Sequence, residues 1–196
     1  MIRAVLFDLD GVIRHFDPAY VVAIEERYRL ESGTLDRVAF SHELLARVTT
    51  GRIGRHEWIE HIGQAVAHPA AAAEWGRQPW VFDEPVLELV EELRGLGLTT
   101  AILTNGTDSI GSELAGSRVE ESIDAVFNSA EIGYAKPDPR AFEHVLNTLG
   151  VAAESVFFTD DSSSKLSGAA ALGIKAHLYL GVETLRVALR AVGIPC

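Results

Sequence analysis

The sequence predicts an α/β fold, in which a doubly wound parallel sheet of five strands carries an inserted block of helices. Short apolar runs alternate with amphipathic helical patterns, as expected when helices cover both faces of a parallel sheet. A long stretch of helical pattern separates the first apolar run from the second. We therefore predict a core of residues 1–13 and 83–196, with residues 14–82 inserted as a small helical lid. The 196 residues, 47% of them hydrophobic, suffice for one sizeable core and such an accessory unit.

The first strand ends in a pair of acids. Residues 5–7 form a continuous apolar run, which is typical of a strand buried on both faces. Asp8 and Asp10 follow where this strand should emerge, and Gly11 comes directly after them. Two carboxylates about 4 Å apart repel each other by roughly 4 kcal/mol at an effective dielectric constant of 20. Something must compensate this charge, most simply a metal ion.

The inserted block is expected to be helical up to about residue 82. Asp17 can cap a helix and Pro18 suits its first turn. Apolar residues at helical spacing then form one stripe, made of Trp58, Ile59, Ile62 and Val66. Glycines and prolines divide the block into short helices. Its tryptophans could stack on a substrate, but in a small helical unit such residues usually form the core; they are Trp58, Trp75 and Trp80.

After residue 82 the pattern alternates between helix and strand. Asp83 and Pro85 open a helix that should close at residues 95–97, and Asp138 and Pro139 open another that ends at Gly150. The remaining predicted strands are 98–103, 125–127, 156–159 and 174–179. Further helices are expected after Gly106, over 169–172 and over 182–192.

Composition excludes several classes of partner. A formal net charge of −11 and a pI near 5.0 argue against binding to a nucleic-acid backbone or an anionic membrane. The single cysteine, Cys196, allows no intramolecular disulfide and no zinc–thiolate site, which fits a reducing cytoplasm. No signal peptide or membrane span is recognised. Nothing in the sequence indicates an oligomeric state.

Polar residues follow three of the predicted strands, and a fourth polar element precedes a helix. Asp160 and Asp161 follow one strand and residues 104–106 (Thr-Asn-Gly) follow another, while Lys136 lies in a loop. Alone, these features are often a helix cap, a turn and a solvated lysine. Because ligands bind beyond the carboxyl ends of parallel strands, their joint occurrence with Asp8 and Asp10 predicts one site.

These groups suit phosphoryl transfer. Asp8 can attack phosphorus to form an aspartyl-phosphate, and Asp10 can give a proton to the leaving oxygen and later take one from water. A Mg²⁺ ion would take carboxylate oxygens of Asp8 and Asp161 and the backbone carbonyl of Asp10. The predicted phosphate-binding groups are Lys136, Thr104 and the backbone amides near Asn105 and Gly106. The substrate is then a small-molecule phosphate ester.

The chain resembles members of the haloacid dehalogenase superfamily, in the subgroup with a small helical cap. The resemblance rests on residues 7–12, 103–106 and 160–162, and on Gly133 with residues 136–139. It implies a Rossmann-like, phosphatase-like core with sheet order 5-4-1-2-3 and an obligate Mg²⁺. It also implies that Asp161 contacts the metal directly while Asp160 supports it from behind, and that the cap selects the substrate.

Two positions distinguish this chain from other members of that superfamily. The dehalogenases lack an acid at the position of Asp10, so the resemblance favours a phosphatase. Many relatives carry Asn where this chain has Lys165, which would alter the support of the metal carboxylates or add a cation near the phosphate. His15 stands out among the histidines because it lies just past the acids, whereas His56 and His61 are spaced wrongly for a zinc pair.

The leading hypothesis is Mg²⁺-dependent hydrolysis of a small phosphate monoester, sugar-phosphate-like by analogy with small-cap relatives. A phosphosugar mutase would use the same aspartyl-phosphate but return the phosphoryl group to a sugar. A phosphate-binding protein that has lost catalysis is the third possibility, against which the complete set of motifs argues.

Overall fold

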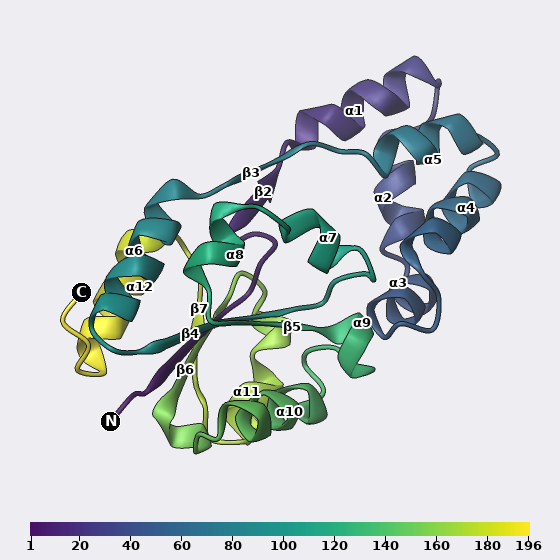
Figure 1. The fold of residues 1–196 in the computed structure, drawn as a ribbon. Coiled ribbons are helices and arrows are strands. Elements are labelled where there is room, and N and C mark those ends of the chain that lie inside the picture. Colours follow the sequence, from purple (N-terminus) through teal and green to yellow (C-terminus); the bar gives the residue numbers. More distant parts are fainter.

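A five-stranded parallel sheet forms the centre of the molecule (Figure 1). The computed structural model describes residues 1–196, and the sheet order is β5-β4-β1-β6-β7. The strands are β1 (Ala4–Phe7), β4 (Thr99–Thr104), β5 (Ala125–Asn128), β6 (Val156–Asp160) and β7 (Lys175–Leu178). This confirms the predicted α/β class, the five strands, and the order 5-4-1-2-3 when the sheet strands alone are numbered along the chain.

Strand β1 lies between β4 and β6, and this arrangement gathers the polar strand ends. Phe7 is in register with Ile102 of β4 and with Thr159 of β6. The chain segments that follow these three strands therefore leave the sheet at one edge, where Asp8, Thr104 and Asp160 lie.

Both faces of the sheet are packed with apolar side chains. Val5 and Phe7 belong to a buried cluster with α6 (Glu84–Gly95) and α12 (Val182–Ala191), whereas Leu6 packs on the opposite face. The second face is covered by α10 (Pro139–Leu149) and α11 (Ser167–Ala171), as Figure 1 shows. Alternating side chains of one short strand thus serve two cores, which explains its continuous apolar sequence.

The helix starts expected from Asp-Pro signals are confirmed. The side chain of Asp138 accepts a hydrogen bond from Arg140 N at 3.0 Å, and that of Asp83 accepts one from Val86 N at 3.1 Å. The remaining core helices are short: α7 (Ile110–Leu114), α8 (Arg118–Ser122), α9 (Ser129–Ile132), and the 3₁₀ turns η1 (Ala153–Ser155) and η2 (Ser163–Lys165).

The inserted block has an apolar cluster of its own. Its helices are α1 (Pro18–Arg27), α2 (Thr34–Ala39), α3 (His42–Thr49), α4 (Arg55–Ala65) and α5 (Pro69–Trp75). Trp58 and Trp75 are buried in this cluster, as expected, with ring centroids 5.1 Å apart. Trp80 lies outside this cluster and contacts Phe82 instead, with ring centroids 4.9 Å apart.

The prediction that the block is wholly helical is wrong at both ends. Strands β2 (Arg14–Phe16) and β3 (Trp80–Phe82) pair antiparallel and connect the block to the core (Figure 1). The aromatic and β-branched residues at 80–82 favour a pleated strand once a partner is available, and that partner is distant in sequence. Beside this ribbon, His15 Nε2 lies 3.2 Å from Asp83 Oδ2. None of the helices is both long and apolar enough to cross a lipid bilayer.

Candidate active site

A buried cluster of charges lies at the carboxyl edge of the sheet. Lys136 Nζ is 2.8 Å from Asp8 Oδ1 and 2.7 Å from Asp160 Oδ2. All three residues are almost inaccessible to solvent, with at most 3% of their surface exposed. Lys136, which was predicted to lie in a loop, thus lies between one acid at the end of β1 and another at the end of β6. The positive charge of this lysine partly balances the negative charge of Asp8.

Lys165 is the second cation of this cluster. Its Nζ atom lies 3.4 Å from Asp8 Oδ2 and 3.9 Å from Asp160 Oδ1. The Lys165 ammonium group thus faces the carboxylates of the cluster. The short η2 turn, which begins just after Ser162, brings it there.

The pKa values of the two buried acids, Asp8 and Asp160, are shifted in opposite directions. Burial opposes the charged form of Asp8, but the charges of Lys136 and Lys165 outweigh it and hold the pKa of Asp8 below its usual value. Asp160 differs, because burial and the neighbouring charge of Asp8 raise its pKa. Of the two acids, Asp8 therefore loses its proton more readily.

Three carboxylates converge on one possible metal position. Single oxygen atoms of Asp8, Asp160 and Asp161 lie within 4.8 Å of one another. Asp160 is bound to Lys136 and also accepts from Ser162 N at 2.9 Å, whereas Asp161 is exposed. Gly11, with φ +92°, approaches Asp161 so closely that a Cβ atom there would lie 2.1 Å from its Oδ2.

The donor set fits Mg²⁺. It consists of oxygen atoms only, as this hard cation prefers. Three carboxylates against the two lysine ammonium groups leave one net negative charge. A divalent cation would make the cluster positive, which suits an anionic substrate. Asp8 and Asp161, both predicted as ligands, belong to this group, and so does Asp160.

Asp10 does not join the acid cluster through its carboxylate. Strand β1 ends at Phe7, and a turn then carries Asp10 toward Arg14, whose guanidinium holds it at 2.5 Å (Nε–Oδ1) and 3.0 Å (Nη2–Oδ2). The two carboxylates would share one side of the chain only if the strand geometry persisted, and the strand ends at Phe7. A metal contact predicted for Asp10 can involve only its backbone carbonyl in this arrangement.

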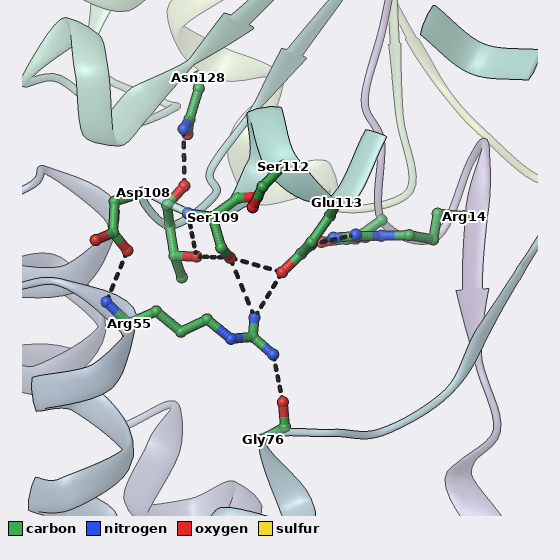
Figure 2. A network of polar contacts seen from close by, with 10 residues as sticks. Arg14, Arg55, Gly76, Asp108, Ser109, Ser112, Glu113 and Asn128 are labelled. Carbon is green, nitrogen blue, oxygen red and sulfur yellow. Dashed lines mark hydrogen bonds and ion pairs between the residues drawn. The ribbon is translucent and has the colours of Figure 1, made fainter. Parts of the chain in front are cut away.

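Arg14 was not recognised from the sequence. It is 3% exposed, and its Nη1 atom also binds Glu113 Oε2 at 2.6 Å (Figure 2). An arginine that directly follows the apolar residues Val12 and Ile13 was the available signal, because a buried guanidinium requires anionic partners. Partial burial raises the pKa of Asp10, against the opposing effect of Arg14.

Thr104, Asn105 and Gly106 lie at the end of β4, close to the lysine loop. Thr104 is buried. The Asn105 side chain donates to Lys136 O and accepts from Lys136 N, both at 2.8 Å, so it positions that loop. The Asn105 carboxamide is thus committed to the protein, which restricts its predicted phosphate contact to the backbone.

Residues 2–173 match the haloacid dehalogenase-like hydrolase family. The chain belongs to this family.

Several known proteins are similar to this chain in sequence or in fold. A protein named phosphatase MT3486 from Mycobacterium tuberculosis is 30% identical, over 90% of this chain and 87% of its own length. The HAD family enzyme BT-2542 from Bacteroides thetaiotaomicron, solved with magnesium and inorganic phosphate, has a TM-score of 0.74 at 22% identity, covering 91% of this chain and 94% of its own. L-2-haloacid dehalogenase from Xanthobacter autotrophicus has a TM-score of 0.68 at 22% identity, covering 100% and 85%. Two further relatives are longer, and the chain spans only 21% and 37% of them.

This haloacid dehalogenase-like hydrolase also has a cavity of about 330 Å³ between the inserted block and the core. Asp10, Asn105 and Gly106 line it on the core side, and aromatic and aliphatic side chains of the inserted block line it on the other. Forty per cent of the Asp10 side chain is exposed, and this exposed part faces the cavity. The predicted proton donor therefore lies between the acid cluster and this cavity.

A polar network forms one wall of that cavity and joins the two parts of the hydrolase (Figure 2). Arg55 of α4 donates to Glu113 Oε1 at 2.9 Å and to Gly76 O, and its backbone N–H donates to Asp108 Oδ1 at 2.7 Å. Burial opposes ionisation of Glu113, but Ser109, Arg14 and Arg55 hold its pKa below the usual value. Arg14, Glu113 and Arg55 thus form a charged chain from the inserted block to Asp10.

Proposed function

We propose that this hydrolase is a Mg²⁺-dependent phosphatase that acts on a small phosphate monoester through an aspartyl-phosphate on Asp8. The observation that carries the proposal is the state of Asp8, which is buried and kept ionised by two lysines at the edge of a converging acid cluster. A carboxylate of this kind is a nucleophile that solvent water does not shield.

Two displacements follow at phosphorus. An oxygen of Asp8 attacks, the ester P–O bond breaks, and protonated Asp10 gives its proton to the leaving oxygen. Asp10, now a carboxylate, takes a proton from water as that water attacks the aspartyl-phosphate. The P–O bond to Asp8 breaks, inorganic phosphate leaves, and the second displacement restores Asp8. The raised pKa of Asp10 suits an acid that is protonated at the start of each cycle.

The groups around the phosphate neutralise its charge. Lys136, the Thr104 hydroxyl and the backbone amides at Asn105 and Gly106 would bind the transferred group. Asp8, Asp161 and the carbonyl of Asp10 would hold Mg²⁺, with Asp160 supporting Lys136 behind them. When bound, the metal supplies positive charge that screens the phosphate from the carboxylates.

The name of one similar protein and the ligands bound in another support this assignment. One is named a phosphatase and is 30% identical, and another was solved with magnesium and inorganic phosphate. The family also includes a dehalogenase with chloropropionic acid covalently bound. Asp10 favours the phosphatase, because hydrolysis of an ester needs a proton donor for the leaving oxygen whereas a departing halide does not.

The inserted block, residues 14–82, acts in this proposal as a cap domain over a core of residues 1–13 and 83–196. Its separate apolar cluster and its ribbon connection support that division. The cap would select the alcohol part of the ester, because the core groups contact only the phosphoryl part. The enzyme would work in the cytoplasm, on the argument from its single cysteine.

Asp8→Asn tests the proposal, with p-nitrophenyl phosphate as substrate and Mg²⁺ present. We expect a loss of phosphate release of at least about 10³-fold, because the amide is not a nucleophile. Excess EDTA should abolish the wild-type rate, and added Mg²⁺ should restore it. Release at near the wild-type rate by Asp8→Asn would overturn the mechanism. An isomerised sugar phosphate with little free phosphate would identify a mutase, and Mg²⁺ binding without turnover on any ester would identify a binding protein.

A further inference from the structure

The cavity beside Asp10 has an aromatic wall. Trp58 and Trp75 meet edge to face, and the Phe40 ring lies 6.3 Å and 6.0 Å from them between centroids. Phe40 is 53% exposed, so a large ring is left in contact with solvent at the cavity. Aliphatic side chains of Val21 and Val48 continue this wall.

The indole N–H groups are not available to a ligand. Trp58 Nε1 donates to Ala39 O at 3.1 Å, and Trp75 Nε1 donates to Asp36 Oδ1 at 2.9 Å. Both bonds lie within the inserted block. The tryptophans therefore offer ring carbon atoms to the cavity, and their polar atoms stabilise the block instead.

Several other polar side chains of the wall are also engaged. The guanidinium groups of Arg14 and Arg55 bind Glu113 and further oxygen atoms of the protein. Thr49 Oγ1 donates to Leu45 O at 2.8 Å. Few donors of these three side chains remain for the hydroxyl groups of a sugar, and a hydroxyl buried without a partner loses its bonds to water.

We infer that the ester hydrolysed at this site carries an apolar alcohol group, aliphatic or aromatic, which fills the cavity next to Asp10. This inference rests on the proposed phosphatase function and replaces the sugar phosphate suggested by analogy. The phosphoryl group binds at Asp8, the leaving oxygen points toward Asp10, and the carbon skeleton contacts Phe40, Trp58 and Trp75. A volume of about 330 Å³ lies at the lower end of the usual range for small-molecule sites.

A series of phosphate esters of primary alcohols tests the inference. We expect kcat/KM to rise about threefold to fourfold per methylene from ethyl to hexyl phosphate, until the cavity is filled. Glucose 6-phosphate is a matched comparison, because it is also a six-carbon ester of a primary alcohol. Hexyl phosphate should exceed it in kcat/KM by about tenfold or more. Equal or better hydrolysis of glucose 6-phosphate would overturn the inference.

Phe40→Ala localises the effect to the cavity. Its exposed ring is not part of the acid cluster, so kcat/KM for hexyl phosphate should fall about fivefold to tenfold, and by more than kcat/KM for ethyl phosphate. Val22→Ala is the matched control, because this side chain is exposed on the same block but does not line the cavity. An equal loss in both variants, or in neither, would contradict the assigned contact.

Binding of alkylphosphonates separates this inference from the proposed function, since their C–P bond cannot be hydrolysed by this route. Calorimetry with Mg²⁺ present should show affinity increasing from ethyl- to hexylphosphonate in the wild type, and a smaller increase in Phe40→Ala. If no ester is turned over, the phosphatase proposal fails while this series still decides the inference. If the affinity did not depend on the length of the alkyl chain, the inference of an apolar alcohol group would be overturned, even if the enzyme were an active phosphatase.

Discussion

Lys136 is the residue on which the buried acid cluster depends most directly. In Lys136→Met, Asp8 and Asp160 lose their nearest positive charge while remaining buried. We expect the free energy of unfolding at pH 7 to fall by about 3–5 kcal/mol, as when one partner of a buried ion pair is removed. Urea unfolding measures this, with the exposed Lys175→Met as control.

The pH dependence of that loss has a defined sign. In the wild type the pKa of Asp8 is lowered by folding, so its stabilising effect is complete above the unfolded-state pKa and is lost as the pH falls through the folded-state pKa. In Lys136→Met, burial becomes the main influence on the pKa values of Asp8 and Asp160. Both carboxyl groups then bind protons more tightly in the folded state than in the unfolded state. The deficit should therefore shrink from pH 7 to pH 5, and a constant deficit would contradict this electrostatic explanation.

Arg14 is expected to tune the proton donor. Its guanidinium opposes protonation of Asp10, so Arg14→Gln should raise the pKa of Asp10 further. Because the protonated form is the active acid, the alkaline limb of kcat/KM should move to higher pH by about 1 to 3 units. Arg14→Lys, which keeps the charge, should return most of the shift. An unmoved limb would exclude Asp10 as the group that sets it.

For single residues, the sequence predicted which acids lie close together at the sheet edge, but it did not predict the pairing of Arg14 with Glu113. Asp8, Asp160 and Asp161 follow buried strands of one parallel sheet, so their proximity could be predicted. The bond between Arg14 and Glu113 joins residues 99 positions apart on elements whose packing the sequence pattern does not specify. The direction of the Asp10 carboxylate depended on that pairing and was unpredictable for the same reason.

Among the elements, an ion pair between α4 and α7 links the inserted block to the core. Arg55 follows Gly54 at the start of α4, and its partner Glu113 lies in α7. Glu113→Gln removes the charge shared by Arg14 and Arg55 without changing the shape of the side chain. We expect faster amide hydrogen exchange at residues 51–58 and a higher KM, because the cavity wall is no longer fixed.

Glu74→Gln is the control for that experiment. Glu74 pairs with Arg27 entirely inside the inserted block, so its loss leaves the contact with the core intact. Hydrogen exchange at residues 51–58 should then remain as in the wild type. Similar exchange in Glu113→Gln and Glu74→Gln would mean that the network does not hold the block.

The elements themselves were predictable where local signals were strong. An Asp cap followed by a Pro in the first turn begins α1, α6 and α10, and Gly150 in the left-handed conformation ends α10, as predicted. The ribbon of β2 and β3 was missed because each strand has three residues and forms only against its partner. Such short strands carry no periodicity of their own, and their pairing is a tertiary interaction.

At the scale of the whole molecule, the balance of charge in the site predicts how folding and metal binding are linked. The cluster keeps one net negative charge after both lysines are counted, so the fold should persist without metal while still favouring a dication. An ion that binds only the folded chain adds about 1.4 kcal/mol at ten times its dissociation constant. For a chain of this length, Mg²⁺ should then raise Tm by about 3–6 °C.

Asp161→Asn tests that linkage without disturbing the core. Asp161 is exposed, so the metal-free Tm should change little, but the Mg²⁺-dependent rise should largely disappear because a carboxylate ligand is lost. Glu143→Gln removes an equally exposed acid outside the cluster and should keep the full rise. If Asp161→Asn retained it, the cation would bind elsewhere, and the large negative charge of the chain as a whole would explain the stabilisation better than the acid cluster.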